Sequence, residues 1–255
     1  MTSDVELVGG WIADAQRVAV LTGAGISTDS GIPDFRGPQG VWTKNPAAEK
    51  TATLQNYLAD PEVRRAAWRT RLESGLWSAQ PNTGHRALVE IERAGKLHGV
   101  VTQNIDELHQ RAGIDPDLVI EVHGTAWWTR CMSCADRRPM AETLSRVGDG
   151  EADPPCLVCG GILKSDTISF GQALVPEVID RAMAVCRTCD VLLAVGSTLS
   201  VYPAASCVPL AAAAGARVAI INGAATEMDH LADAMLCGPI SELLPAVVAA
   251  GTATS

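Results

Sequence analysis

The sequence lacks an excess of positive charge. It carries 20 Lys and Arg against 29 Asp and Glu, a formal net charge of −9, and its pI is near 5.0. The field around such a protein repels phosphate backbones and anionic lipid headgroups. We therefore expect no stable binding to nucleic acid and no attachment to a membrane.

The sequence also lacks targeting and membrane-spanning segments. Its first residues, MTSDVE, have neither the basic start nor the apolar core of a signal peptide, and they are too acidic for a transit peptide. No apolar run reaches the length that spans a bilayer. These absences predict a cytoplasmic protein. In that reducing compartment the 8 cysteines favour metal binding or buried thiols over disulfides.

The chain has enough apolar residues for a sizeable core, since they make up 47% of its 255 residues. Segments rich in β-branched residues have the pattern of strands buried on both faces: 18–22, 99–103, 119–122, 190–196 and 217–222. Segments with apolar residues three and four apart predict helices: 3–16, 83–94, 105–111, 176–189, 203–214 and 240–250. This alternation predicts an α/β fold, a parallel sheet with helices on both faces.

Two segments interrupt the alternation. Residues 35–81 have no strand pattern and are rich in Trp, Arg and proline breaks, while residues 124–170 contain four cysteines and several Pro and Gly positions. We interpret both as insertions that form a second, smaller lobe. Residues 251–255 have the composition of a frayed tail.

A glycine loop, Gly23-Ala24-Gly25, directly follows the first predicted strand. At this position a parallel sheet and the next helix can hold a pyrophosphate through backbone amides. The dinucleotide fingerprint is incomplete, because Thr28 stands where a third small residue is expected and no ribose-binding carboxylate is evident about 20 residues further on. A tight turn without a ligand therefore remains an equal alternative.

Two Cys-x-x-Cys pairs predict a zinc site. Cys131 and Cys134, followed by Cys156 and Cys159, can present four thiolates tetrahedrally to one ion. Four cysteines complete the coordination shell, so we expect one structural Zn²⁺ per chain and no catalytic role for it. Four buried free thiols are the alternative.

The other cysteines predict packing rather than metal binding. Cys186 and Cys189 lie on a predicted helix, and we expect buried thiols there, with a redox pair as the sharper alternative. We expect Cys207 and Cys237 to be packed as well.

Polar residues follow two of the predicted strands. Gln103, Asn104 and Asp106 follow one strand, and His123 follows the next. Open α/β sheets bind ligands at this carboxyl edge, where a histidine can act as a general base. In the alternative interpretation, Asn104 and Asp106 cap a helix and His123 only bonds backbone. For the other histidines, we expect His85 in the first turn of a helix capped near Thr83, and no partners for His98, His109 and His230.

In combination these motifs resemble the sirtuin family of NAD-dependent protein lysine deacylases, over residues 18 to 245. The matching motifs occur in the family's order: GAGIS at 23–27, GIPDFR at 31–36, TQNIDELH at 102–109, VHG at 122–124, the two cysteine pairs, GS at 196–197 and IN at 221–222. The resemblance implies a Rossmann-like NAD-binding domain formed by residues 1–35, 82–123 and 171–255. It also implies a small domain made of a helical insert, 36–81, and a zinc-ribbon insert, 124–170, with the active cleft between the domains.

The resemblance also implies the site residues. The implied NAD contacts are Gly23, Ala24, Gly25, Asp34, Phe35, Arg36, Gln103, Asn104, Asp106, Gly196, Ser197, Asn222, Gly238 and Ile240. The implied catalytic residues are His123 and Asn104. In the family mechanism the acyl-lysine oxygen captures the ribose carbon that nicotinamide leaves, and His123 deprotonates a ribose hydroxyl, which yields free lysine, nicotinamide and O-acyl-ADP-ribose.

The implied partner is an acylated lysine protein or peptide, added as an extended strand near Phe170-Gly171 and Leu199-Ser200-Val201. Gln172, Ala224 and Ala225 depart from common family residues. Sirtuins that remove succinyl groups carry Tyr and Arg three residues apart on the helical insert, where this chain has Trp68 and Arg71. Arg71 can pair an acidic acyl group, but Trp68 lacks the phenol and an exposed amphipathic helix explains both residues, so uncharged acyl groups are favoured.

Two other functions remain as alternatives. A sirtuin-like mono-ADP-ribosyltransferase uses the same NAD site but has less need of the His123 base. A zinc-ribbon module that binds nucleic acid or acts as a silencing scaffold is disfavoured by the acidic charge. The oligomeric state is left open by the sequence.

Overall fold

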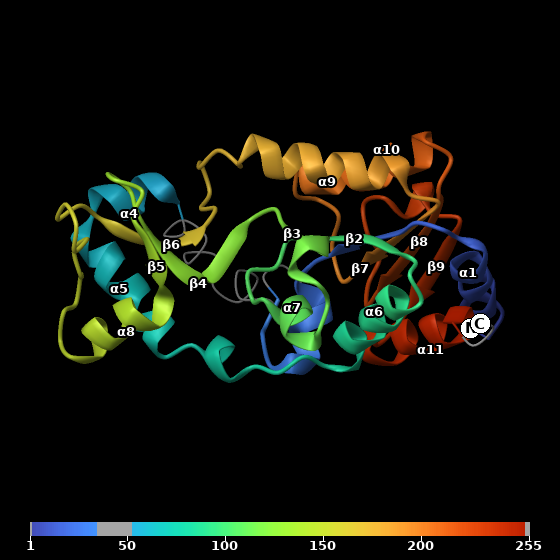
Figure 1. Cartoon of the computed structure of the whole chain (residues 1–255), viewed down its shortest axis with the longest axis horizontal. Coiled ribbons are helices and arrows are strands. Elements are labelled where there is room, and N and C mark those ends of the chain that lie inside the picture. Colours follow the sequence, from blue (N-terminus) through green and yellow to red (C-terminus); the bar gives the residue numbers. More distant parts are fainter. Residues whose placement is uncertain (1, 35–52, 253–255) are drawn as a thin grey trace.

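The computed structural model describes residues 2–34 and 53–252. Its larger part is built on a six-stranded parallel sheet with the order β3-β2-β1-β7-β8-β9 (Figure 1). The strands are β1 (Val18–Thr22), β2 (Leu97–Thr102), β3 (Val119–Glu121), β7 (Val191–Val195), β8 (Arg217–Asn222) and β9 (Ala234–Cys237).

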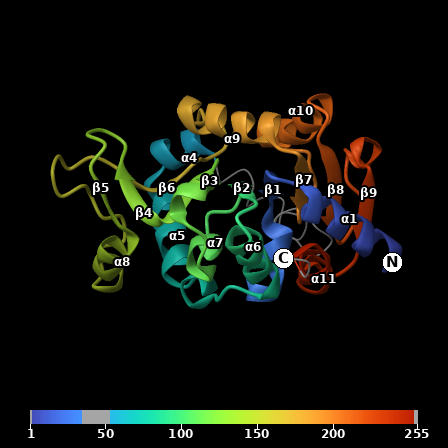
Figure 2. The ribbon, with the colours of Figure 1, turned by 45° about the vertical axis from the view of Figure 1, so that its right-hand side comes forward.

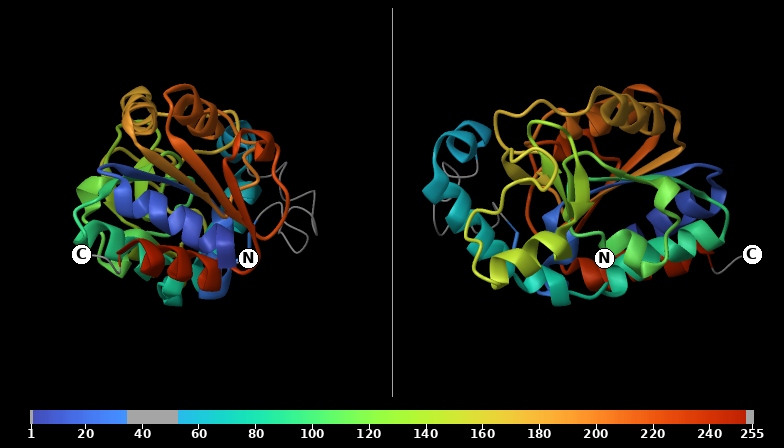
Figure 3. Two further views of the ribbon diagram at one scale, coloured as in Figure 1. Left: turned by 90° about the vertical axis from the view of Figure 1, so that its right-hand side faces the viewer. Right: turned by 60° about the vertical axis from the view of Figure 1, so that its left-hand side comes forward.

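Helices cover both faces of this sheet, as Figures 1 and 3 show. One face carries α1 (Thr2–Asp14), α6 (Thr83–Arg93) and α11 (Ile240–Thr252), and the other carries α9 (Pro176–Thr188) and α10 (Cys207–Ala213). Val18 and Val20 of β1 belong to the first core, whereas Ala19 and Leu21 belong to the second. Because successive side chains of a strand point to opposite faces, the apolar residues of this one strand support two hydrophobic cores.

Short segments connect these elements, and most of them carry polar residues toward the carboxyl edge of the sheet. They are η1 (Ala24–Ser30), α7 (Leu108–Ala112), η3 (Pro116–Leu118), η4 (Ala204–Ser206) and η5 (Asp229–Leu231). None of the helices in residues 2–34 and 53–252 combines the length and the apolar character needed to cross a membrane.

A smaller unit lies at the end of the molecule away from β9 (Figure 2). It contains an antiparallel sheet of order β5-β4-β6, namely β5 (Arg137–Pro139), β4 (Gly124–Cys131) and β6 (Leu163–Thr167). Its helices are α4 (Leu54–Ala59), α5 (Pro61–Leu72), η2 (Gly75–Ser78) and α8 (Met140–Gly148). Trp68 is fully buried in the core of this unit, with Met140 and Leu163, so the expectation that it lies exposed on an amphipathic helix is wrong.

The predicted α/β class and all five predicted strands are confirmed, with ends that differ by two residues or fewer. The four-residue strand β9 was not predicted. The helix expected over 105–111 begins at Leu108, because Glu107 has a left-handed backbone (φ 57°). The helix expected over 203–214 is divided into η4 and α10, and α11 continues through Gly251, which is buried and not frayed.

The glycine loop after β1 is pressed against the end of β7. A Cβ on Gly25 would lie 2.8 Å from Gly196 Cα, and a Cβ on Gly23 would lie 2.7 Å from the Gly196 carbonyl oxygen. Gly196 itself has φ +65° and approaches the backbone of Ile26. Around Gly25 the three nearest opposing atoms all belong to the Gly196 backbone, so no side chain can move aside to admit a larger residue there.

We expect Gly25→Ala to lower the free energy of unfolding by about 1–3 kcal/mol, the usual cost of overpacking. Gly10→Ala is the matched control, because a Cβ there has no atom within 4 Å and the residue lies within α1. Denaturant unfolding of both variants measures the difference. Equal stability of Gly25→Ala and the wild type contradicts the close approach.

Candidate active site

His123 lies directly beyond β3, at the carboxyl edge of the sheet. Its Nδ1 is 3.0 Å from the Gln103 carbonyl oxygen. A carbonyl only accepts hydrogen bonds, so Nδ1 carries the proton and Nε2 keeps its lone pair. Burial lowers the pKa of the imidazole, and the bond to Gln103 opposes that effect only in part. The ring is therefore a neutral base at pH 7.

Asn104 and Asp106 meet the hydroxyl of Ser27 below the glycine loop. Asn104 Nδ2 donates to the Gly23 carbonyl oxygen and to Ser27 Oγ, both at 3.1 Å. Ser27 Oγ donates to Asp106 Oδ2 at 2.7 Å. These bonds fix the Asn104 amide, and they leave its Oδ1 without a protein partner in the part of the chain that the structure describes. Asn104 therefore does not cap a helix, whereas Asp106 Oδ1 does accept from Leu108 N at 2.9 Å.

Two buried histidines extend this network. His85 accepts from Asn82 N at Nδ1 and lies 3.4 Å from Ser27 Oγ through Nε2. His109 Nε2 is 2.9 Å from Thr22 Oγ1, and the two rings are 5.1 Å apart. Burial lowers the pKa of both rings, that of His85 to about 4. His85 does lie in a capped first turn, with Asn82 as the N-cap.

The expectation that His98 and His109 have no partners is wrong, because His98 Nε2 also contacts Thr188 Oγ1, at 2.8 Å. No sequence pattern predicts the contact between His109 and Thr22, because the two residues lie on different elements that only the fold brings together. Ser27 belongs to the GAGIS motif, but the motif does not predict that its hydroxyl bonds both Asn104 and Asp106.

The remaining predicted cofactor residues lie at the carboxyl ends of strands in the parallel sheet. Gln103 Nε2 donates to Ser197 Oγ at 2.9 Å, which joins the ends of β2 and β7. Gly238 N donates to the Asn222 carbonyl oxygen at 3.1 Å, which joins β8 and β9. The Ile240 side chain is buried in the core, so only its backbone can reach a ligand.

Asp34 is half-buried at the end of the first described segment, whereas Phe35 and Arg36 lie outside the described residues. The donor set at this edge consists of a glycine loop without room for side chains, amides, hydroxyls and one buried carboxylate. This set fits a dinucleotide.

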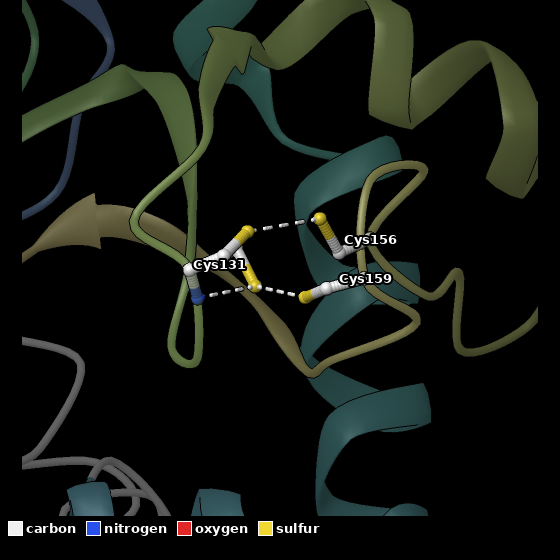
Figure 4. Close-up of side chains that lie close together, drawn as sticks. Cys131, Cys156 and Cys159 are labelled. Atoms are coloured by element: carbon white, nitrogen blue, oxygen red, sulfur yellow. Dashed lines mark hydrogen bonds between the residues drawn. The ribbon is translucent and has the colours of Figure 1, made fainter.

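The four cysteines of the predicted metal site come together between two hairpins (Figure 4). Their sulfur atoms lie within 4.8 Å of one another, with 3.5 Å between Cys131 and Cys159 and 3.7 Å between Cys134 and Cys156. A tetrahedral zinc with bonds of about 2.3 Å requires sulfur atoms about 3.8 Å apart. The cluster therefore fits one four-coordinate Zn²⁺, with no position left for a reactive water.

Backbone amides stabilise the thiolate form of Cys131, which is the form that binds a metal cation. Burial opposes ionisation of Cys131, but N–H groups of Cys134 and Ser133 and the neighbouring thiols outweigh it and lower its pKa to about 6. A Cβ on Gly161 would lie 3.1 Å from Cys131 Sγ. The glycine is therefore required for the approach of the second hairpin.

We expect Cys134→Ser to reduce the zinc content after dialysis from one ion per chain to near zero, and to unfold the smaller unit. Cys237→Ser is the control, because Cys237 is exposed and distant in sequence from the cluster. Metal analysis and the near-ultraviolet signal of the buried Trp68 report the two effects. Full zinc content in Cys134→Ser contradicts the assignment.

The other cysteines do not form a redox centre. Cys186 and Cys189 are buried. The neighbouring Cys207 thiol and burial raise the pKa of Cys186, and burial raises that of Cys189 to about 11. Neither carries the thiolate that a redox pair needs. Cys207 is packed as expected, but the expectation that Cys237 is packed is wrong, since it is exposed.

Glu121, the last residue of β3, is a further ionisable group near this edge, and no pattern in the sequence predicts its role. Burial, together with the Glu107 carboxylate, raises its pKa to about 7, while the Gln110 amide and Arg137 oppose this. Its Oε1 and the Gln110 Oε1 are both buried and lack a partner among the described residues. Burial therefore favours the protonated acid.

Because the folded pKa of Glu121 is raised, its contribution to stability is present at low pH and is lost as the pH rises through about 7. We expect Glu121→Gln to be more stable than the wild type at pH 8, by about 1–2 kcal/mol, and to match it near pH 5. Glu73→Gln, at an exposed glutamate, is the control. A Glu121→Gln stability difference that does not change with pH contradicts the assignment.

The predicted substrate residues differ in accessibility. Phe170 is 37% exposed and its carbonyl accepts from Leu54 N at 2.9 Å, and Gly171 follows it in a turn with φ +78°. Leu199 is buried with φ +56°, and Val201 is half-buried. Arg71 is half-buried, with its guanidinium carbon 5.5 Å from the ring of the buried Trp68.

The comparisons with known proteins agree with this geometry. The model of the Sir2 family matches residues 23–203, and the chain belongs to this family. The NAD-dependent protein deacetylase 2 of Streptomyces coelicolor is 48% identical over 231 residues, covering 91% of this chain and 96% of that protein.

Two solved structures extend the likeness to three dimensions. A structure described as the structural basis for the mechanism and regulation of Sir2 enzymes superposes with a TM-score of 0.90 at 34% identity, covering all of both chains. A Sir2 variant solved with a deacetylated p53 peptide and 3′-O-acetyl ADP-ribose has a TM-score of 0.89 at 29% identity, covering 98% of this chain and 99% of the other.

Proposed function

We propose that the protein is an NAD-dependent protein lysine deacylase of the deacetylase type, which transfers the acyl group of an acyl-lysine to ADP-ribose and releases nicotinamide. The observation that carries this conclusion is the orientation of His123, whose Nδ1–H bond to the Gln103 carbonyl leaves the lone pair of the neutral ring on Nε2, at the edge where the predicted cofactor residues gather. The substrate class is acylated lysine in proteins or peptides. The named function of the relatives supports this assignment.

We also propose the domain limits and the site assignments that the family resemblance implies. The NAD-binding domain comprises residues 1–35, 82–123 and 171–255, and the small domain comprises residues 36–81 and 124–170. The six-stranded sheet and the smaller antiparallel sheet support this division. The cofactor residues are those named above at the strand ends, with Phe35 and Arg36 outside the described residues.

NAD, when bound, supplies a ribose that receives the acyl group and a nicotinamide that leaves. The protein's part is to orient these groups and to move one proton. Asn104 presents Oδ1, because its Nδ2 is held by Gly23 and Ser27. His123 accepts a proton at Nε2 and, once charged, is stabilised by its Nδ1–H bond to the Gln103 carbonyl.

The acyl group is the finer point of the proposal. We assign uncharged acyl chains, because Trp68 is fully buried and offers no phenol and the Arg71 guanidinium donates to the Ala67 carbonyl of its own helix. Succinyl-lysine turnover faster than acetyl-lysine turnover contradicts this assignment.

We expect His123→Asn to lower the rate of nicotinamide release from NAD and an acetyl-lysine peptide by about 10²–10⁴-fold, the usual contribution of a general base. The wild-type rate should fall only below the ordinary imidazole pKa of about 6.5, because burial keeps the base neutral to lower pH. His98→Asn is the control, since His98 lies at the opposite end of β2 from Gln103. Full activity of His123→Asn contradicts the proposal.

Mass spectrometry of a target protein separates this function from mono-ADP-ribosylation. A deacylase removes the mass of the acyl group from the target, whereas a transferase adds the mass of ADP-ribose. Added ADP-ribose without acyl loss contradicts the deacylase assignment.

A further inference from the structure

Two segments of the chain extend outward from His123. The backbone N–H of Ile168 donates to the His123 carbonyl oxygen at 2.8 Å, so the segment 168–175 starts beside the main chain of His123. On the other side Gln103 bonds both His123 Nδ1, through its carbonyl, and Ser197 Oγ, through its amide. Two successive hydrogen bonds, through Gln103, therefore connect His123 to Ser197, the first residue of the segment 197–203.

Both segments carry no formal charge. The sequence has no Asp, Glu, Lys or Arg from residue 167 to 176 or from residue 191 to 216. Instead they expose large apolar side chains: Phe170 is 37% exposed, Val175 48% and Tyr202 63%. Glu227 approaches through its backbone, with its N–H on the Thr198 carbonyl oxygen at the long distance of 3.4 Å.

The main chain of the second segment has open hydrogen-bonding groups. Thr198 and Val201 use their carbonyl oxygens within the protein, and Leu199 uses its N–H on Ser197 Oγ. Among the described residues, the N–H groups of Ser200 and Val201 and the Ser200 carbonyl oxygen have no partner. Such a row of groups pairs with an added extended chain.

We propose that these two segments select acyl-lysine substrates with large apolar residues next to the modified lysine, and disfavour substrates with charged residues there. The inference rests on the proposed deacylase function and names the peptide class that this site takes. An apolar neighbour gains burial against Phe170, Val175 or Tyr202. A charged neighbour loses hydration and meets no opposite charge from either segment.

A panel of acetyl-lysine peptides tests this selection. The peptides share one length and place Leu, Ser, Asp or Lys at the two positions on each side of the acetyl-lysine, and nicotinamide release with NAD gives kcat/KM for each. We expect the Leu-flanked peptide to exceed both the Asp- and the Lys-flanked peptides by about fivefold or more, in line with partial burial of one apolar side chain. Equal kcat/KM across the panel, within twofold, overturns the inference.

Two substitutions assign the selection to the segments. Val175→Lys and Tyr202→Lys, one on each segment, should each raise the kcat/KM of the Asp-flanked peptide and lower that of the Lys-flanked peptide, by about threefold or more. Leu7→Lys on α1 is the matched control, with 46% exposure against 48% for Val175, and its profile should equal that of the wild type. Unchanged profiles in both segment variants overturn the inference, provided that their unfolding midpoints match the wild type.

The panel also separates this inference from the proposed function. Failure of the deacylase assignment gives no NAD-dependent acyl loss from any peptide. Failure of the selection alone gives acyl loss from all of them at the same rate.

Discussion

The arrangement of polar residues at the carboxyl edge of the parallel sheet depends on the hydrogen bonds of the Ser27 hydroxyl. It accepts from Asn104 Nδ2 and donates to Asp106 Oδ2, and it lies beside His85 Nε2. A buried hydroxyl with only part of its bonds satisfied costs free energy, whereas a complete set holds each partner in one orientation. One small side chain on η1 therefore aligns an amide and a carboxylate from the connection between β2 and α7 and an imidazole from α6.

The smaller unit is stabilised in a different way. Its described core contains few apolar side chains, chiefly Trp68, Met140 and Leu163, with Cys131 and Cys156 beside them. A core of that size does not hold two hairpins and the helices α4, α5 and α8 in place without a further constraint. The four-sulfur cluster provides it, because metal binding there contributes directly to folding. The zinc ion thus stabilises the smaller unit and takes no part in bond breaking.

Sequence patterns predicted the sheet, the four-cysteine cluster and the gathering of polar residues at the carboxyl edge. Strands such as Val191–Val195 are apolar throughout, and the cysteine spacing has few other structural meanings. The failures have physical reasons. The late start of α7 depends on the backbone angle of Glu107, and the burial of Trp68 depends on packing against residues far away in the sequence. The partners of His109 and the environment of Glu121 are likewise set by tertiary contacts.

Burial shifts the pKa values of Glu121, the last residue of β3, and of His123, two residues later, in opposite directions. It lowers the pKa of His123, which keeps the base neutral, and it raises the pKa of Glu121, which keeps the acid neutral. Both shifts arise because charge is poorly solvated at this edge of the sheet. The segments 168–175 and 197–203 carry no charged residue. A charge on a peptide bound between these segments would find no opposite charge on either of them, so we infer that the proposed selection and the neutral state of His123 both follow from poor stabilisation of charge.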